Sequence, residues 1–157
     1  MLQVQQYSKL VYQIIGAAMF VHTELRWGLL EPVYQEALHV ELLNRKINNQ
    51  GEQEVAIFYR GQQLEKKYKM DLVVDDIIIE LKSVSKILPS HRAQLCNYLR
   101  LTRKPVGLLI NFGTKELYGE RWVFDEDTNE CYIVNREMQP IDIDYVDMLS
   151  YNDVEGE

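Results

Sequence analysis

The segment from Tyr68 to Ser83 constrains the fold of this chain more than any other stretch. Two strand-like runs flank the tight turn at Asp75-Asp76, which predicts a β-hairpin. The second run, Ile77–Leu81, is almost unbroken in its apolar character, as is typical of a central strand that is covered on both faces. Because such a strand needs packed layers above and below it, the segment predicts an α/β architecture with helices on both sides of a sheet.

Three ionisable side chains interrupt this hairpin. Asp71 lies on the first strand, and Glu80 and Lys82 lie two residues apart on the second, so these two point to the same face. A charged group on a buried strand is costly unless it has a partner. Two carboxylates beside a lysine suit a magnesium-type ion and an activated water. The simpler alternative is a solvated Glu–Lys pair on the surface of an ordinary hairpin.

The bulk composition bounds the class of protein. A chain of 157 residues suffices for one domain with a real core. No apolar run approaches the length of a membrane span, and the N-terminus lacks the pattern of a signal peptide. Cys96 and Cys131 are far apart in the sequence and lack ligand spacing, so neither a disulfide framework nor a zinc site is predicted. We therefore expect a cytoplasmic protein without membrane association.

Charge is distributed unevenly along the chain. The net charge is −7, yet residues 60–104 hold ten Lys or Arg against five Asp or Glu. Residues 105–157 hold three against thirteen, so we expect one domain over residues 1–137 and an acidic tail over 138–157. A local basic surface can attract phosphates despite an acidic total, although strand lysines also serve to block edge pairing. The candidate phosphate contacts are Lys66, Lys67, Lys69, Lys86, Arg92, Arg100, Arg103 and Lys104.

Periodicity along the chain predicts the remaining elements. An amphipathic helix is expected over residues 7–24, Arg26-Trp27-Gly28 breaks the pattern after it, and a second helix begins near Glu31 with an apolar stripe. That stripe comprises Val33, Ala37, Val40 and Leu42 or Leu43. A strand over 54–59 precedes the hairpin, Ser90 caps a helix to Leu101, and a buried strand covers 106–112. A final hairpin pairs residues 121–124 with 130–135.

Several motifs together resemble a known group of proteins. Gly28-x-x-Glu31-x-x-Tyr34 is similar to the signature of the GxxExxY protein family. Asp71, Glu80-Leu-Lys82 and Gln94-x-x-x-Tyr98 resemble the core of the PD-(D/E)XK nuclease superfamily, particularly its RecB-like exonuclease branch. The resemblance runs from about Ile14 to Val123 and rests on the order of the motifs. One departure is Leu25-Arg26-Trp27-Gly28, where members usually carry L-G-x-G, so Trp27 is either a base-stacking or a packing residue.

The resemblance implies a fold, an activity and a set of site residues. The fold would be a restriction-endonuclease-like αβββαβ core with a central mixed sheet and an extra N-terminal helix. Asp71 and Glu80 would bind Mg²⁺ or Mn²⁺, with Glu31 completing the metal shell and His22 as a further candidate ligand. Lys82 would orient the attacking water and stabilise charge in the transition state. Gln94 and Tyr98 would position Lys82, a carboxylate or the DNA backbone.

Two classes of function remain open on the sequence. The first is a metal-dependent nuclease acting on DNA, in an exonuclease-like or structure-specific manner, because no separate module for reading base edges is present. RNA is an alternative substrate for such a nuclease, and a homodimer is its expected assembly. Metal-dependent hydrolysis of another kind of phosphoester is a further alternative. The second class is a catalytically silent nuclease-fold module for nucleic-acid or protein interaction. Failure to bind a divalent metal would distinguish it.

Overall fold

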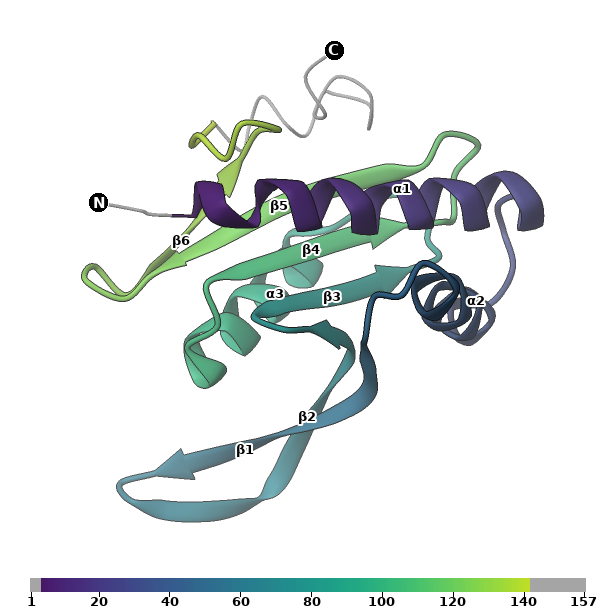
Figure 1. The fold of residues 1–157 in the computed structure, drawn as a ribbon. Coiled ribbons are helices and arrows are strands. Elements are labelled where there is room, and N and C mark those ends of the chain that lie inside the picture. Colours follow the sequence, from purple (N-terminus) through teal and green to yellow (C-terminus); the bar gives the residue numbers. More distant parts are fainter. Residues whose placement is uncertain (1–3, 142–157) are drawn as a thin grey trace.

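A six-stranded sheet forms the middle layer of the molecule, with α1 and α2 on one face and α3 on the other (Figure 1). The computed structural model describes residues 4–141, so most of the expected acidic tail lies outside the described residues. After a short 3-10 turn at Gln5–Tyr7, the helices are α1 (Ser8–Leu25), α2 (Glu31–Asn44) and α3 (Pro89–Thr102). The strands are β1 (Gln50–Tyr59), β2 (Gln62–Val74), β3 (Ile77–Lys82), β4 (Val106–Asn111), β5 (Tyr118–Asp125) and β6 (Glu130–Val134).

The strands follow one another across the sheet in chain order, from β1 to β6. Among the strands within residues 4–141, only β3 and β4 pair in parallel, from Ile77 opposite Val106 to Lys82 opposite Asn111. Helix α3 makes the crossover between them, which a parallel pair requires. The other neighbours pair antiparallel. The α/β class and the mixed sheet expected from the sequence are therefore confirmed.

Each face of the sheet carries its own apolar core. Helices α1 and α2 pack on one face through residues such as Ile14, Leu38 and Leu42. Helix α3 packs on the other through Leu95 and Leu99. The apolar run Ile77–Leu81 is buried on both sides, as its composition predicts. No helix in the described part of the chain is long and apolar enough to cross a membrane.

The apolar stripe predicted for α2 is wrong in its phase. The helix buries Tyr34, Leu38 and Leu42, which recur every four residues. Val33, Val40 and Leu43 are instead more than two-fifths exposed. The reason lies in the tertiary structure. The Tyr34 ring stacks on the ring of Phe112, the residue directly after β4, with ring centroids 4.6 Å apart. This contact fixes which face of α2 turns toward the core. Only Leu42 of the predicted set, and Ala37 in part, face the core.

One helix boundary agrees with the prediction and one differs. Helix α1 ends at Leu25, one residue past the predicted end, and Arg26 takes a positive φ of 65° while its N–H donates to the carbonyl of His22. Gly28, with a φ of 91°, lies in the loop that follows. Helix α3 begins at Pro89 rather than with Ser90 as its cap. The backbone N–H of Leu88 donates instead to Nδ1 of His91 at 3.0 Å.

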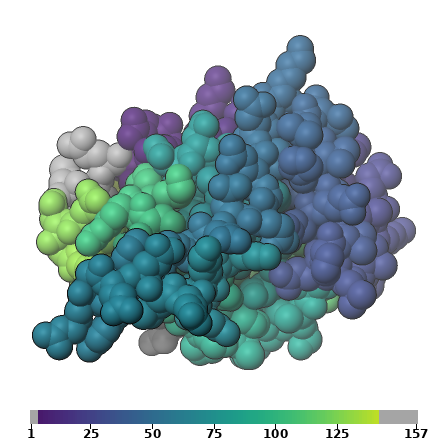
Figure 2. Space-filling view, turned by 90° about the horizontal axis from the view of Figure 1, so that it is seen from below, coloured from purple at the N-terminus to yellow at the C-terminus, as the bar shows by residue number. Residues whose placement is uncertain are grey.

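The β1–β2 hairpin is longer than predicted and projects beyond the other elements (Figures 1 and 2). At its far end every residue from Phe58 to Lys69 is exposed. The turn at Arg60 and Gly61 has positive φ at both positions. The expected final hairpin, β5–β6, is confirmed, and packing continues past residue 137 because Met138 is buried.

The two cysteines are closer in space than their separation in the sequence indicates. The thiol of Cys131 lies 3.7 Å from the carbonyl oxygen of Cys96, and both cysteines are free. Cys96 is on α3 and Cys131 on β6, so the contact exists because α3 packs on the face of the sheet that includes β6. Neither residue lies in the cluster of ionisable groups described below.

A tight contact holds the loop after β3 against the loop after β4. The Asn111 side chain accepts from the N–H of Val84 at 3.0 Å and donates to its carbonyl at 2.9 Å. Gly113 then passes so close that a Cβ there would lie 2.3 Å from both the backbone nitrogen and oxygen of Val84. Because backbone atoms cannot turn aside as a side chain can, only glycine fits at this position.

We therefore expect Gly113→Ala to lower the free energy of unfolding by about 3 kcal/mol or more, since overpacking forces the backbone to shift. Gly16→Ala is the matched control. Its nearest neighbour is the Arg45 guanidinium at 3.6 Å, and alanine in a helix should stabilise by about 0.5–1 kcal/mol. Urea unfolding followed by circular dichroism measures both. Equal stabilities of the two variants would contradict the contact.

Candidate active site

Asp71 and Glu80 face each other where β2 and β3 part. The paired residues of these strands end at Leu72 opposite Ile79. Beyond that pair, the N–H of Asp71 donates to Oε1 of Glu80 at 3.1 Å, and the N–H of Leu81 donates to Oδ2 of Asp71 at 2.8 Å. Each carboxyl group is thus fixed by the backbone of the other strand, and within residues 4–141 its second oxygen accepts no hydrogen bond.

Burial, and then neighbouring negative charge, raises the pKa values of the three acids of this site. Burial and then the charge of Asp71 raise the pKa of Glu80 to about 8. Burial also raises the pKa of Asp71, against the stabilising N–H of Leu81 and the charge of Lys82. The pKa of Glu31 is raised by burial and by Asp71, and again Lys82 opposes the shift. The three carboxyl groups therefore share one electrostatic environment with Lys82.

Lys82 is held by a chain of polar contacts from α3. Its Nζ donates to Oε1 of Gln94 at 3.4 Å, and Nε2 of Gln94 donates to the Tyr98 hydroxyl at 2.9 Å. That hydroxyl donates in turn to the carbonyl of Lys69 on β2 at 3.2 Å. Burial and the charge of Glu80 raise the pKa of Tyr98 to about 12, so the phenol stays a proton donor. The sequence pair Gln94 and Tyr98 thus connects α3 to both strands of the site.

The Gly28-x-x-Glu31-x-x-Tyr34 motif builds the wall opposite α3. The Tyr34 hydroxyl donates to the carbonyl of Arg26 at 2.6 Å and accepts from the N–H of Leu29 at 3.0 Å. These bonds close the loop before α2, where the positive φ of Gly28 is needed. Glu31 is thereby placed in the first turn of α2, half-buried beside Asp71.

The donor set of this site fits a hard divalent cation. Carboxylate oxygens are the ligands that Mg²⁺ and Mn²⁺ prefer, and a cation would offset the mutual repulsion of Glu31, Asp71 and Glu80. Among residues 4–141, no three His, Cys, Asp or Glu side chains are already gathered as a metal cluster. The acids are therefore a candidate donor set rather than a preformed cage.

Two predicted site residues lie elsewhere. Nε2 of His22 is 2.9 Å from the carbonyl oxygen of Thr114, and its ring packs near Phe112, which accounts for its burial. Arg92 is 5% exposed and forms a buried ion pair with Glu120, with Nη2 to Oε2 at 2.6 Å. A phosphate contact by Arg92 would require breaking this pair, so we leave Arg92 out of the proposed surface.

The structure also brings in residues that the sequence reasoning missed. Nε2 of Gln35 donates to the Asp71 carbonyl at 3.2 Å and to Oε1 of Glu52 at 3.0 Å, tying α2 to β1 and β2. The charge of Glu52 also raises the pKa of Asp71. The one feature of the sequence that could have indicated Gln35 is its position directly after Tyr34 of the motif. Nothing in the sequence marks Glu52.

The raised pKa of Glu80 predicts a pH dependence of stability in EDTA. Between its ordinary value of 4.5 and about 8, the folded protein holds a proton that the unfolded chain has released. The free energy of unfolding should therefore fall as pH rises from about 5 to 8, by a few kcal/mol at about 1.4 kcal/mol per pKa unit. Glu80→Gln should flatten this slope, whereas Glu65→Gln, at an exposed position on β2, should leave it unchanged. A slope that survives in Glu80→Gln would contradict the assignment to Glu80.

Comparison with known proteins gives the family. The model of the PD-(D/E)XK nuclease superfamily matches residues 8–122, a range that includes every residue of the site described above. The crystal structure of SSO0001 resembles this chain with a TM-score of 0.42 and 23% sequence identity, over 73% of this chain and 52% of that one. This chain thus spans about half the length of that protein, and no curated protein matches it. The match over most of the sequence shows that the chain belongs to the PD-(D/E)XK nuclease superfamily.

Proposed function

We propose that this protein is a metal-dependent nuclease that hydrolyses phosphodiester bonds of DNA. The observation that carries the proposal is the convergence of Asp71 and Glu80 with Lys82 where two strands part. Membership of a nuclease superfamily supports the reaction class. Within that superfamily, we further propose the GxxExxY family and the RecB-like exonuclease branch, on the motifs quoted from the sequence.

Each site residue has a role that follows from its contacts. Bound to Asp71, Glu80 and Glu31, Mg²⁺ or Mn²⁺ would polarise the phosphate and make a water molecule more acidic. Lys82 supplies a positive charge and N–H donors beside the carboxylates, where it can orient the water and stabilise charge that develops on the phosphate. Gln94 holds Lys82, and Tyr98 holds Gln94, so the ammonium group is pre-positioned.

The remaining basic residues divide into exposed and engaged side chains. Lys66, Lys69 and Lys86 are exposed and make no ion pair within residues 4–141. The others have partners: Lys67 pairs with Glu54, Lys104 donates to the Asp75 carbonyl, Arg100 contacts Asn97 and Asn129, and Arg103 lies over the Phe124 ring. Lys69 lies two residues before Asp71 on β2, and Lys66 lies farther out on the same strand. We propose these two as the principal phosphate contacts.

Other features of the proposal concern substrate and assembly. We propose exonuclease-like or structure-specific cutting and a cytoplasmic location, with RNA as the alternative substrate. A homodimer would use the exposed apolar side chains of Phe20, Val33 and Val40, which line a shallow groove between α1 and α2. The acidic segment after residue 141 lies outside the described residues.

The decisive test is cleavage of labelled single-stranded, blunt and flapped DNA with Mg²⁺ or Mn²⁺. Glu80→Gln and Lys82→Met should each reduce the cleavage rate by a factor of about 100 or more, because each removes a group acting on the transition state. Lys9→Met, at an exposed position on α1, is the matched control and should cleave like the wild type. The ladder of products gives the direction of cutting.

Calorimetry with Mn²⁺ separates the nuclease from the silent module. The wild type should bind Mn²⁺, and Glu80→Gln should bind it at least tenfold more weakly because it loses a charged ligand. Neither cleavage nor Mn²⁺ binding by the folded wild type would overturn the proposal. That result would leave a nuclease fold used for interaction.

Charge reversal tests the proposed DNA surface. Lys66→Glu and Lys69→Glu should weaken binding to all DNA sequences alike, because phosphate contacts carry no base information. Each should also reduce the slope of log K against log salt by about 0.9 for duplex or about 0.7 for single-stranded DNA. Fluorescence anisotropy in EDTA measures both, with Lys9→Glu as the control. An unchanged affinity and salt slope would remove β2 from the DNA path.

A further inference from the structure

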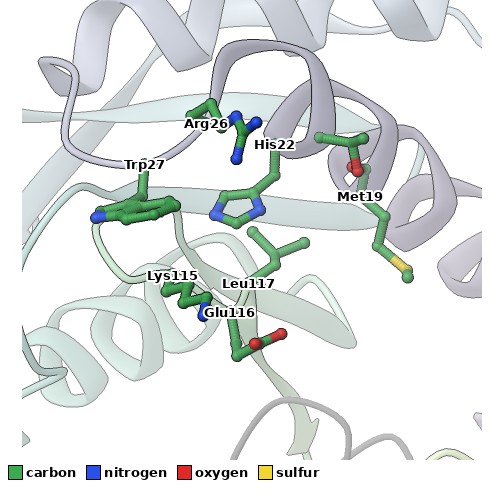
Figure 3. A pocket seen from close by; sticks show the side chains of 8 residues that line it. Met19, His22, Arg26, Trp27, Lys115, Glu116 and Leu117 are labelled. Carbon is green, nitrogen blue, oxygen red and sulfur yellow. The ribbon is translucent and has the colours of Figure 1, made fainter.

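A pocket of about 400 Å³ lies beside the candidate active site and is formed by α1, the loop after it and the loop after β4 (Figure 3). Its lining residues are Met19, His22, Thr23, Arg26, Trp27, Lys115, Glu116 and Leu117. Because Trp27 forms one wall, we call it the Trp27 pocket. None of these residues belongs to the acidic cluster or to the chain of contacts around Lys82.

The lining of the Trp27 pocket combines an aromatic wall with cationic groups. In Figure 3 the Trp27 indole stands on one side, the Arg26 guanidinium points inward, and Lys115 lies across from it. Trp27 is 44% exposed, although a large aromatic residue gains by being covered. Met19 and Leu117 supply apolar surface, and Glu116 is the one acid among the lining residues.

The cations of this pocket are available to a ligand. Arg26 and Lys115 are exposed, and neither forms an ion pair within residues 4–141. Arg26 is held in place by its backbone, because its φ of 65° ends α1 and its carbonyl accepts from the Tyr34 hydroxyl. The unusual loop Arg26-Trp27-Gly28, which departs from the related pattern, therefore presents two adjacent side chains to one cavity.

The pocket adjoins the active site through two contacts. The N–H of Phe112 donates to the Lys82 carbonyl at 2.8 Å, and the Phe112 ring lies against His22 of the pocket with centroids 6.1 Å apart. The Ser83 hydroxyl donates to the carbonyl of Leu29, in the same loop as Trp27. Both sites therefore lie at the end of the sheet where the parallel strands β3 and β4 finish.

We propose that the Trp27 pocket binds a nucleotide, with the base stacked on Trp27 and the phosphate between Arg26 and Lys115. Stacking on an exposed aromatic ring is the common way to hold an unpaired base. Arginine matches phosphate geometry through paired N–H donors, and lysine adds a point charge. If the nucleotide is part of the strand being cut, the proposal rests on the proposed nuclease function. If the nucleotide is a free mononucleotide, the proposal is independent of that function.

Tryptophan fluorescence tests the pocket directly, because the chain has two tryptophans and the second, Trp122, is buried. Titration of the Glu80→Gln protein with dAMP in EDTA should quench the emission in a saturable manner. Trp27→Phe should abolish the change and leave the Trp122 emission constant. Arg26→Ala and Lys115→Ala should each weaken dAMP binding about tenfold or more, as expected for a lost charge-assisted contact.

Two controls make the readout specific. Deoxyadenosine, which lacks the phosphate, should bind equally weakly to the parent protein and to Arg26→Ala. Lys9→Ala, a distant change of the same charge, should leave dAMP binding unchanged. Absence of saturable quenching by dAMP in a folded protein would overturn the proposal. Equal dAMP affinity in the parent, Arg26→Ala and Lys115→Ala proteins would also overturn it.

A second titration identifies the source of the nucleotide. A ten-nucleotide single strand should quench Trp27 in competition with dAMP if the pocket holds part of the substrate strand. Quenching by dAMP that the strand does not displace would overturn the strand subsite and assign the pocket to a free mononucleotide. Because these titrations use Glu80→Gln without divalent metal, a failure of the nuclease proposal leaves their outcome unaffected.

Discussion

The confinement of two carboxyl groups between β2 and β3 is the constraint on which the rest of the site depends. Glu80 is 3% exposed, lies beside Asp71, and has its pKa raised to about 8 as a result. Folding tolerates this because backbone N–H groups of each strand hold the carboxyl of the other and because Lys82 stands nearby. A site in which three carboxyl groups surround the single ammonium group of Lys82 is suited to accept a divalent cation together with its phosphate ligand.

The molecule contains a second buried acid, Glu120, whose carboxylate is surrounded by hydrogen-bond donors. Glu120 accepts hydrogen bonds from Arg92, the Tyr118 hydroxyl and the indole N–H of Trp122. Those donors satisfy both of its oxygens, whereas Glu80 accepts only one bond, from the Asp71 N–H, within residues 4–141. Glu80 therefore keeps acceptor capacity for a ligand, in agreement with the proposed metal site, whereas the oxygens of Glu120 are engaged by protein donors.

Rigid supports hold the parts of the site at the correct places. The clamp of Asn111 and Gly113 on Val84 fixes the end of β3, and the Tyr34 ring stacked on Phe112 fixes the start of α2. Phe112 directly follows β4 and also packs near the His22 ring. This one aromatic residue therefore links the acidic cluster to the Trp27 pocket. Both sites are thus positioned by the same end of the parallel strand pair, where loops converge over a buried core.

The sequence by itself determined the hairpin with Asp71, Glu80 and Lys82 on it, the buried central strand and the order of helices and strands. Those features depend on local periodicity and on side chains that share a strand or a helix turn, and such spacing is fixed by backbone geometry. Only the tertiary structure decided which face of α2 is buried, because Tyr34 meets a ring from another element. It likewise removed Arg92 from the surface and assigned Trp27 to a pocket, since the partners of these residues lie far away in the chain.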